Sequence, residues 1–169
     1  MWFDAARVVI ALVVAQRLAE LVLAQRNTVR LLAEGGVERG HRHYPIIVLL
    51  HALWLGTLAM MAPGSVQAWW LAAFAVLQAG RVWVLWSLGR YWTTRIITVS
   101  GAPLVRRGPY RWISHPNYLV VALEIPILAL ALDLPWVGLG FGIANLVVLW
   151  WRIRIENQAL QARRVIPAG

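Results

Sequence analysis

Five long apolar segments dominate this sequence and restrict what it can fold into. They are Ala5 to Ala24, Tyr44 to Ala62, Val66 to Leu88, Tyr118 to Leu132, and Leu134 to Trp151. A helix needs about 20 residues to cross the hydrocarbon core of a bilayer, and helices satisfy their backbone hydrogen bonds within the segment. Because 60% of the 169 residues are apolar and only 14% are charged, an ordinary soluble domain is excluded. We expect an all-α integral-membrane bundle of five transmembrane helices that forms one domain over residues 1–169, with a short or tilted fourth helix.

Arginine residues predict how the bundle is oriented. All 16 basic side chains are Arg, and they concentrate after the first, third and fifth segments, whereas the opposite loops hold only Arg7, Asp4 and Asp133. The positive-inside rule therefore predicts an outer amino terminus, a cytoplasmic carboxyl terminus and a polar site on the cytoplasmic face of a bacterial membrane. Nucleic-acid binding is not expected, because the arginines flank apolar segments instead of forming one basic face.

Cysteine is absent, which excludes disulfides, thiolate catalysis and thiolate metal sites. The four histidines do not fall at a zincin spacing, so no metal site is expected. The only glycine-dense apolar stretch, GLGFG, lies inside the fifth apolar segment and follows no predicted strand, so a Rossmann fingerprint is absent as well.

Three polar clusters share the predicted cytoplasmic end. Residues 25–45 carry two glutamates and two histidines beside a basic stretch. Residues 106–126 change from a basic loop through His-Pro-Asn-Tyr into an apolar run that contains Glu124. A carboxylate inside a spanning segment usually faces a cavity or a partner, which favours a functional role for it. In WWRIRIENQAL, Arg152 and Glu156 share one helix face and form either a surface ion pair or part of a site.

The stretch LVRRGPYRWISHPNYL, followed by RIRIENQAL, resembles the isoprenylcysteine carboxyl methyltransferase family of integral-membrane enzymes, which use S-adenosylmethionine. The resemblance implies a substrate-side, catalytic role for Arg152. Ser114 stands where the family usually has Arg, so that guanidinium is supplied by Arg111 or is dispensable. The resemblance also implies cofactor-binding roles for Leu104, Val105, Tyr110, His115, Pro116, Asn117, Tyr118 and Glu156.

A narrower resemblance comes from RNTVRLLAEGGVERGHRHYP together with HPNYLVVALEIP. These stretches are similar to the bacterial branch associated with type III polyketide synthases, whose members O-methylate alkylpyrones and alkylresorcinols. The likeness implies a lipophilic substrate with an acidic hydroxyl, a site surrounded by membrane lipid, and functional coupling to a polyketide synthase. Two alternatives stay open: a prenylated-cysteine carboxylate as substrate, and a non-catalytic lipid-binding bundle whose arginines bind anionic headgroups.

The residues suit methyl transfer on chemical grounds too. An in-line displacement needs mainly the positioning of a nucleophilic oxygen, and a sulfonium is favoured by a carboxylate such as Glu156 and by aromatic faces. A phenolic hydroxyl also needs a proton acceptor within hydrogen-bond reach. Glu124 is the first candidate for that general base, His43 is the second and Glu38 is the third.

Overall fold

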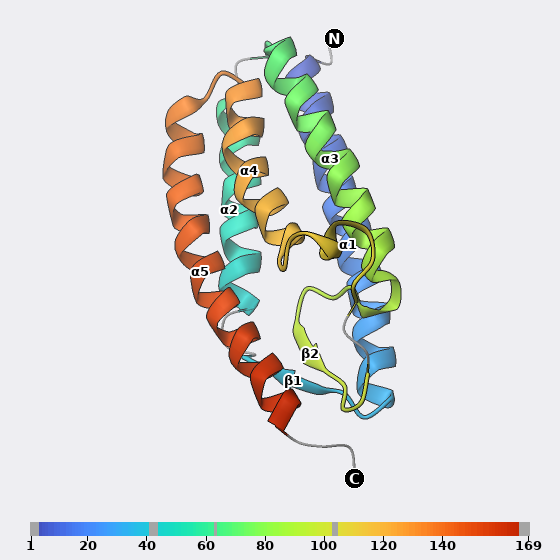
Figure 1. The fold of residues 1–169 in the computed structure, drawn as a ribbon. Helices are drawn as coiled ribbons and strands as arrows, with labels where there is room; N and C mark the ends of the chain where they lie inside the picture. The colour runs from blue at the N-terminus through green and yellow to red at the C-terminus, as the bar shows by residue number, and fades with distance from the viewer. Residues whose placement is uncertain (1–3, 41–43, 63, 103–104, 166–169) are drawn as a thin grey trace.

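Helices make up most of the molecule and run alternately up and down along a common direction (Figure 1). The computed structural model describes residues 4–40, 44–62, 64–102 and 105–165. Its helices are α1 (Ala5–Ala33), α2 (Tyr44–Met61), α3 (Ala68–Leu88), α4 (Pro116–Ala131) and α5 (Pro135–Val165), with short 3-10 helices η2 (Gly89–Tyr91) and η3 (Gly108–Arg111). The predicted helix number and order are confirmed. By length and composition, however, four described helices can cross a membrane, and α4, with 16 residues, is shorter.

Two helices continue well beyond their apolar segments. α1 runs on to Ala33 because QRNTVRLLA contains mostly good helix formers, and it ends just before Gly35, whose φ is +84°. α5 continues to Val165. The polar residues of both extensions are thereby carried on helices. α4 begins with Pro116, because proline is favoured at a first helical position. In the turn from α4 into α5, Asp133 has a φ of +58°.

The two long polar loops meet in a small sheet, which the all-α expectation did not include. β1 (Val37–Arg39) pairs antiparallel with β2 (Ile96–Thr98), with Glu38 opposite Ile97. The Glu38 carboxylate also forms an ion pair with Arg95 at 2.9 Å. Strands this short and this far apart in the chain leave no periodic signal in the sequence, because their pairing is entirely non-local.

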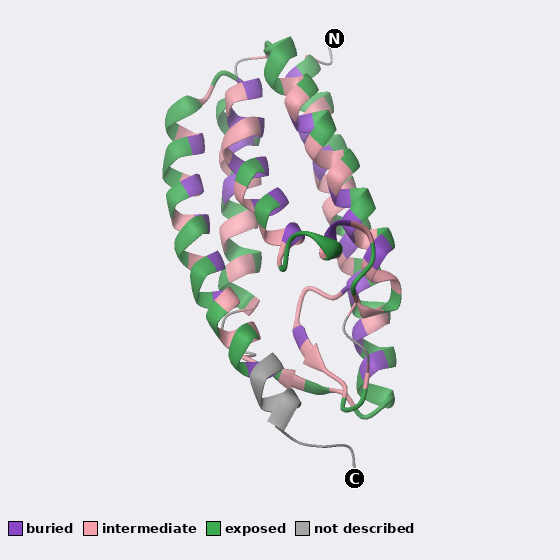
Figure 2. Cartoon of the chain, viewed as in Figure 1, coloured by how far each residue is buried: buried purple, intermediate pink, exposed green. Residues whose placement is uncertain are grey.

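An apolar core closes the end of the bundle that carries the amino terminus (Figures 1 and 2). Side chains from α1, α2, α3 and α4 meet there. Its buried members are Ala6, Ile10, Val13, Trp54, Leu58, Phe74, Ile125, Leu128, Ala129 and Leu132. Large apolar side chains also cover the outside of the helices; Met60 and Trp69 are each 89% exposed. An outer surface of this kind is expected where helices face lipid rather than water.

Gly108 holds the loop before α4 against α3. Its φ is +58°, a left-handed conformation that favours glycine, and a Cβ at this position would lie 2.0 Å from Ser87 Oγ and 2.9 Å from Ser87 Cβ. The close approach of Gly108 to the Ser87 side chain thus depends on the absence of a Cβ.

We expect Gly108→Ala to lower the free energy of unfolding by about 1 to 3 kcal/mol, because it combines backbone strain with overpacking. The measurement is the thermal unfolding temperature of the purified protein in detergent. Gly140→Ala on α5 is the matched control, since a Cβ there would meet nothing within 4 Å. If both variants unfold at the wild-type temperature, the loop does not depend on this contact.

Candidate active site

A cavity of about 490 Å³ lies inside the bundle, with α1 and α2 as its long walls. Along α2 the lining runs from Tyr44 to Ala59, which corresponds to about 22 Å of helix. Most of these walls are aliphatic, with Val14, Leu18, Ile47, Val48 and Leu55 among the lining residues. The cavity therefore has the length and the surface that suit an alkyl chain.

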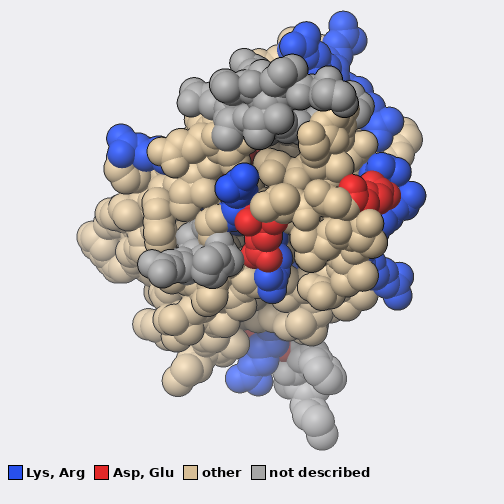
Figure 3. All heavy atoms as spheres, turned by 90° about the horizontal axis from the view of Figure 1, so that it is seen from below, with Lys and Arg blue, Asp and Glu red and all other residues tan. Residues whose placement is uncertain are grey.

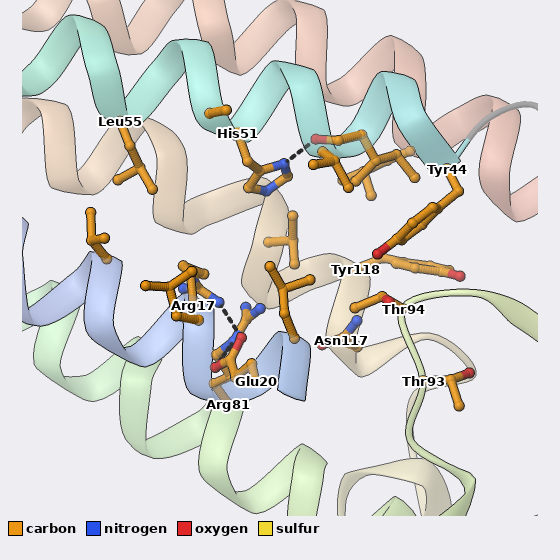
Figure 4. Close-up of a pocket in the computed structure, with 18 of the residues that line it drawn as sticks. Arg17, Glu20, Tyr44, His51, Leu55, Arg81, Thr93, Thr94, Asn117 and Tyr118 are labelled. Carbon is orange, nitrogen blue, oxygen red and sulfur yellow. Dashed lines mark hydrogen bonds and ion pairs between the residues drawn. The ribbon is translucent and has the colours of Figure 1, made fainter. Parts of the chain in front are cut away.

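One end of the cavity is polar. Arg152 lines it, is only 8% exposed, and donates from Nε to the Tyr118 hydroxyl at 2.8 Å and from Nη1 to the Thr94 carbonyl at 2.7 Å. The Tyr118 hydroxyl in turn donates a short hydrogen bond to the Glu156 carboxylate. Arg152 and Glu156 thus lie on one face of α5, as expected, and Tyr118 from α4 joins them. Figure 4 shows Tyr118, Thr94 and Asn117 grouped at this end.

His115 and Tyr110 extend this polar cluster. The His115 ring stacks on Tyr118 with 5.3 Å between ring centres, and its Nε2 lies 3.2 Å from Asn157 Oδ1, a partner that the sequence analysis did not name. Burial raises the pKa of the Tyr110 hydroxyl above its usual range, and the negative charge of Glu156 raises it further. Tyr110 is therefore a protonated hydrogen-bond donor at any physiological pH.

The remaining predicted residues are distributed as follows. Pro116 is buried at the start of α4, and Val105 is half-buried in the loop before η3. Leu104 and His43 lie outside the described residues. Arg111, one of the two alternatives for the family arginine, which is otherwise dispensable, lies with its guanidinium over the Trp112 ring at 5.6 Å. The functional roles of all these residues stay predictions.

Glu124 lies in a second cluster, inside the apolar part of the bundle. Its carboxylate is 3% exposed and accepts hydrogen bonds from Arg17 Nη2 at 2.8 Å, Arg81 Nη1 at 2.7 Å and Gln78 Nε2 at 2.8 Å. Glu20 pairs with the same two arginines, each at 2.7 Å. Each carboxylate meets two guanidinium groups, and the four charges cancel. The cluster joins α1, α3 and α4.

The sequence patterns above indicate Glu124 but not the partners that hold it. Arg17, Glu20 and Arg81 are charged side chains inside apolar segments, and this is the signal that could have found them, because such charges are normally paired or functional. The role of Glu124 as general base stays a prediction.

We expect Glu20→Gln to destabilise the protein by about 3 to 5 kcal/mol, since it leaves two buried guanidinium groups sharing one carboxylate. The measurement is again thermal unfolding in detergent. Glu34→Gln is the control: Glu34 also pairs with two arginines, Arg30 and Arg90, but at the surface, where the loss should stay below about 1 kcal/mol. Equal losses in the two variants would mean that the buried cluster is no more important than a surface pair.

Charged side chains gather at the end of the molecule that carries β1 and β2. Seen from that end, basic groups lie around the rim and also beside the acidic groups near the middle of the face (Figure 3). In part of this charged surface, the Glu34 carboxylate pairs with Arg30 at 3.2 Å and with Arg90 at 2.8 Å. The polar end of the cavity therefore lies at the charged end of the bundle, away from the apolar core.

Comparison with known proteins identifies the family. Residues 70–162, more than half of the chain, match the family described as "Isoprenylcysteine carboxyl methyltransferase (ICMT) family". The matched region contains both the His-Pro-Asn-Tyr motif and the polar cluster of α5. The chain belongs to the isoprenylcysteine carboxyl methyltransferase family. The resemblance seen in the sequence is confirmed.

Membership indicates a methyltransferase that works in a membrane, and methyltransferases of this family use S-adenosylmethionine. Together with four long apolar helices, it makes the chain an integral membrane protein. The chain is also 40% identical over 158 residues to "Uncharacterized protein YpbQ" of Bacillus subtilis (strain 168), covering 90% of this chain and 94% of that protein. No solved structure matches significantly. Neither the family match nor the similarity to the Bacillus subtilis protein shows whether the chain belongs to the polyketide-associated branch.

Proposed function

We propose that this family member is an S-adenosylmethionine-dependent O-methyltransferase that modifies a hydroxyl or carboxyl oxygen of a long-chain lipid. One observation carries the proposal: an apolar cavity ends at a polar cluster made by Arg152, Tyr118 and Glu156. A lipid whose chain lies along α2 would bring its polar head to this cluster. A water-soluble cofactor would approach from the charged end of the bundle.

Residues at the polar end fit the cofactor, which when bound supplies an electrophilic methyl group. Asn117 and Trp92 both line the cavity, and each has a buried polar atom to which no described residue hydrogen-bonds, Oδ1 in Asn117 and Nε1 in Trp92. Buried polar atoms are normally paired, so we propose that these two side chains turn to meet the bound cofactor. The Glu156 carboxylate and the stacked rings of His115 and Tyr118 suit a sulfonium cation. The family resemblance adds Leu104, Val105, Tyr110 and Pro116 to the proposed cofactor site.

Arg152 and Glu156 would serve opposite sides of this site. Arg152 belongs to the cavity wall, whereas Glu156 lies one turn further along α5, toward the charged end. The Tyr118 hydroxyl donates a hydrogen bond to Glu156 and accepts one from Arg152, which fixes both side chains. We propose that Arg152 holds the ionised oxygen of the substrate and that Glu156 binds the cofactor. Holding the oxygen in a fixed place is the main requirement for methyl transfer.

We expect Glu156→Gln to weaken binding of S-adenosylmethionine by about tenfold or more, because the carboxylate that faces its sulfonium loses its charge. Arg152→Ala should keep most of this binding and lower turnover by about 10²-fold or more, as expected for the loss of a group that stabilises charge on the substrate. Calorimetric titration and a methyl-transfer assay measure the two effects.

Arg154→Ala is the matched control for Arg152→Ala. Arg154 lies on the same helix, but its guanidinium contacts the Trp150 ring at 3.7 Å, outside the polar cluster. Mild and equal effects of Glu156→Gln and Arg152→Ala would contradict the assignment. If folded wild-type protein does not bind S-adenosylhomocysteine saturably, the non-catalytic lipid-binding alternative is favoured.

We further propose that the polar end faces the cytoplasm, together with the carboxyl terminus. The loops at the β1 and β2 end carry most of the arginines of the interhelical loops, which the positive-inside rule associates with the cytoplasmic side. This orientation would give the site access to the cellular pool of a soluble methyl donor. Labelling of single cysteines introduced at either end, in intact cells, tests the orientation.

For the substrate we propose an alkylresorcinol or an alkylpyrone supplied by a polyketide synthase, from the narrower sequence resemblance. The prenylated-cysteine carboxylate that gives the family its name is the alternative. A carboxyl group has a pKa of about 4 and is already ionised at neutral pH. A phenol, whose pKa is about 10 in Tyr, must first lose a proton to an acceptor. Glu124, His43 and Glu38 remain the proposed acceptors, in that order. Glu124 is held by Arg17 and Arg81 and lies about 9 Å along α4 from Tyr118, so we propose that it takes the proton through intervening water. The Glu38 carboxylate is engaged by Arg95.

We expect Glu124→Gln to lower the methylation rate of an alkylresorcinol by about 10²-fold or more, the usual scale for losing a general base. An alkylpyrone, whose hydroxyl is much more acidic, should be affected far less. The measurement is the initial rate on each substrate from pH 6 to 10. A loss of folded protein lowers both rates equally, so it cancels in the ratio of the two rates. An equal loss on both substrates at every pH would make Glu124 a structural member of its ion-pair cluster only.

A further inference from the structure

His51 is a polar side chain in the otherwise aliphatic α2 wall of the cavity. Its Nδ1 lies 2.9 Å from the Ile47 carbonyl oxygen. A carbonyl can only accept, so Nδ1 carries the proton, and Nε2 of the neutral imidazole is a hydrogen-bond acceptor. Among the described residues none hydrogen-bonds to Nε2, and Figure 4 shows the ring directed from α2 into the cavity. The wall therefore presents an acceptor without a partner.

Hydrogen-bond donors face the same cavity from the opposite side. Arg17 on α1 and Arg81 on α3 both line it, and Figure 4 shows them across the cavity from His51. Their ion pairs with Glu20 and Glu124 use only some of the guanidinium N–H groups. A hydroxyl group, which both donates and accepts, is complementary to this pair of walls.

This place is separate from the proposed methyl-transfer site. His51 lies about two helical turns from Tyr44, or about 10 Å along α2, on the side away from Tyr118 (Figure 4). Arg152 donates to the Tyr118 hydroxyl and so belongs to that far end. A group that binds Arg152 at the polar end cannot also reach His51. A long lipid that fills the cavity passes His51 with the middle of its chain.

We propose that His51, with Arg17 and Arg81, forms a second polar subsite that binds a hydroxyl group on the chain of the lipid, about 10 Å from the oxygen to be methylated. The proposal rests on the proposed function for the position of the reacting head group. It narrows the substrate to long-chain lipids with an oxygen function within the chain. A plain alkyl chain leaves the imidazole acceptor unpaired in an apolar wall, which costs free energy.

The test compares two alkylresorcinols of equal chain length, one of them with a single hydroxyl about 10 Å from the ring. Dissociation constants are measured by competition with a labelled alkylresorcinol on purified protein in lipid nanodiscs, without cofactor. We expect wild-type protein to bind the hydroxylated lipid about tenfold more tightly, which is equivalent to about 1.4 kcal/mol. His51→Leu should bring the ratio of the two constants to about one, and His51→Gln, which keeps an acceptor, should retain part of it.

Thr57→Val is the matched control. Thr57 is the other polar side chain of α2 that hydrogen-bonds a carbonyl one turn earlier, at 2.8 Å to Leu53, and it is not among the residues that line the cavity. This variant should keep the wild-type ratio. Equal affinities of wild-type protein for both lipids, as expected if only water occupies the subsite, would overturn the proposal. So would a His51→Leu variant that keeps the full preference.

Binding and turnover separate this proposal from the proposed function. A binding preference that depends on His51, in a protein that methylates neither lipid, would support the subsite and contradict the methyltransferase reaction on these lipids. Methylation of both lipids with no preference in binding would support the reaction and overturn the subsite.

Discussion

The buried cluster of Glu20, Glu124, Arg17 and Arg81 is the interaction on which the rest of the structure depends. In a bilayer, lipid chains are as apolar as the side chains, so apolar contact alone does little to decide which helices meet. Paired charges do decide it, because leaving one of them alone in a low dielectric is costly. α4 packs closely against α3 and α5, whereas α1 reaches α3 and α4 largely through these long side chains. Space for a cavity remains between α1 and α2.

The cavity brings together two environments that a lipid-modifying methyltransferase needs. Its walls are aliphatic over most of their length, and its end is made by the hydrogen-bonded set of Arg152, Tyr118 and Glu156. Tyr118 has the central position, since its hydroxyl accepts from one α5 side chain and donates to the other. A small rotation of either helix would separate these groups. The tight loop at Gly108 and the β1–β2 pairing hold the surrounding polar segments in place.

Much of this arrangement could be predicted from local patterns. The apolar segments predicted the helices, and the spacing of Arg152 and Glu156 predicted a shared face because four residues make about one helical turn. The His-Pro-Asn-Tyr motif pointed to the correct family. Other features could not be predicted in this way. The partners of Glu124 lie on two other helices, and the strands that pair around Glu38 come from separate loops.

The sequence by itself therefore determined that this chain is a helical membrane protein, which end of it is basic, and to which family of methyltransferases it belongs. These properties follow from composition, from helical periodicity and from short motifs, all of which are local. Only the tertiary structure decided which charges neutralise one another, where the cavity lies, and that Tyr118 stands between Arg152 and Glu156. The physical reason is that hydrogen bonds and ion pairs act over a few ångströms between residues far apart in the chain, and only the packing of the helices sets those distances.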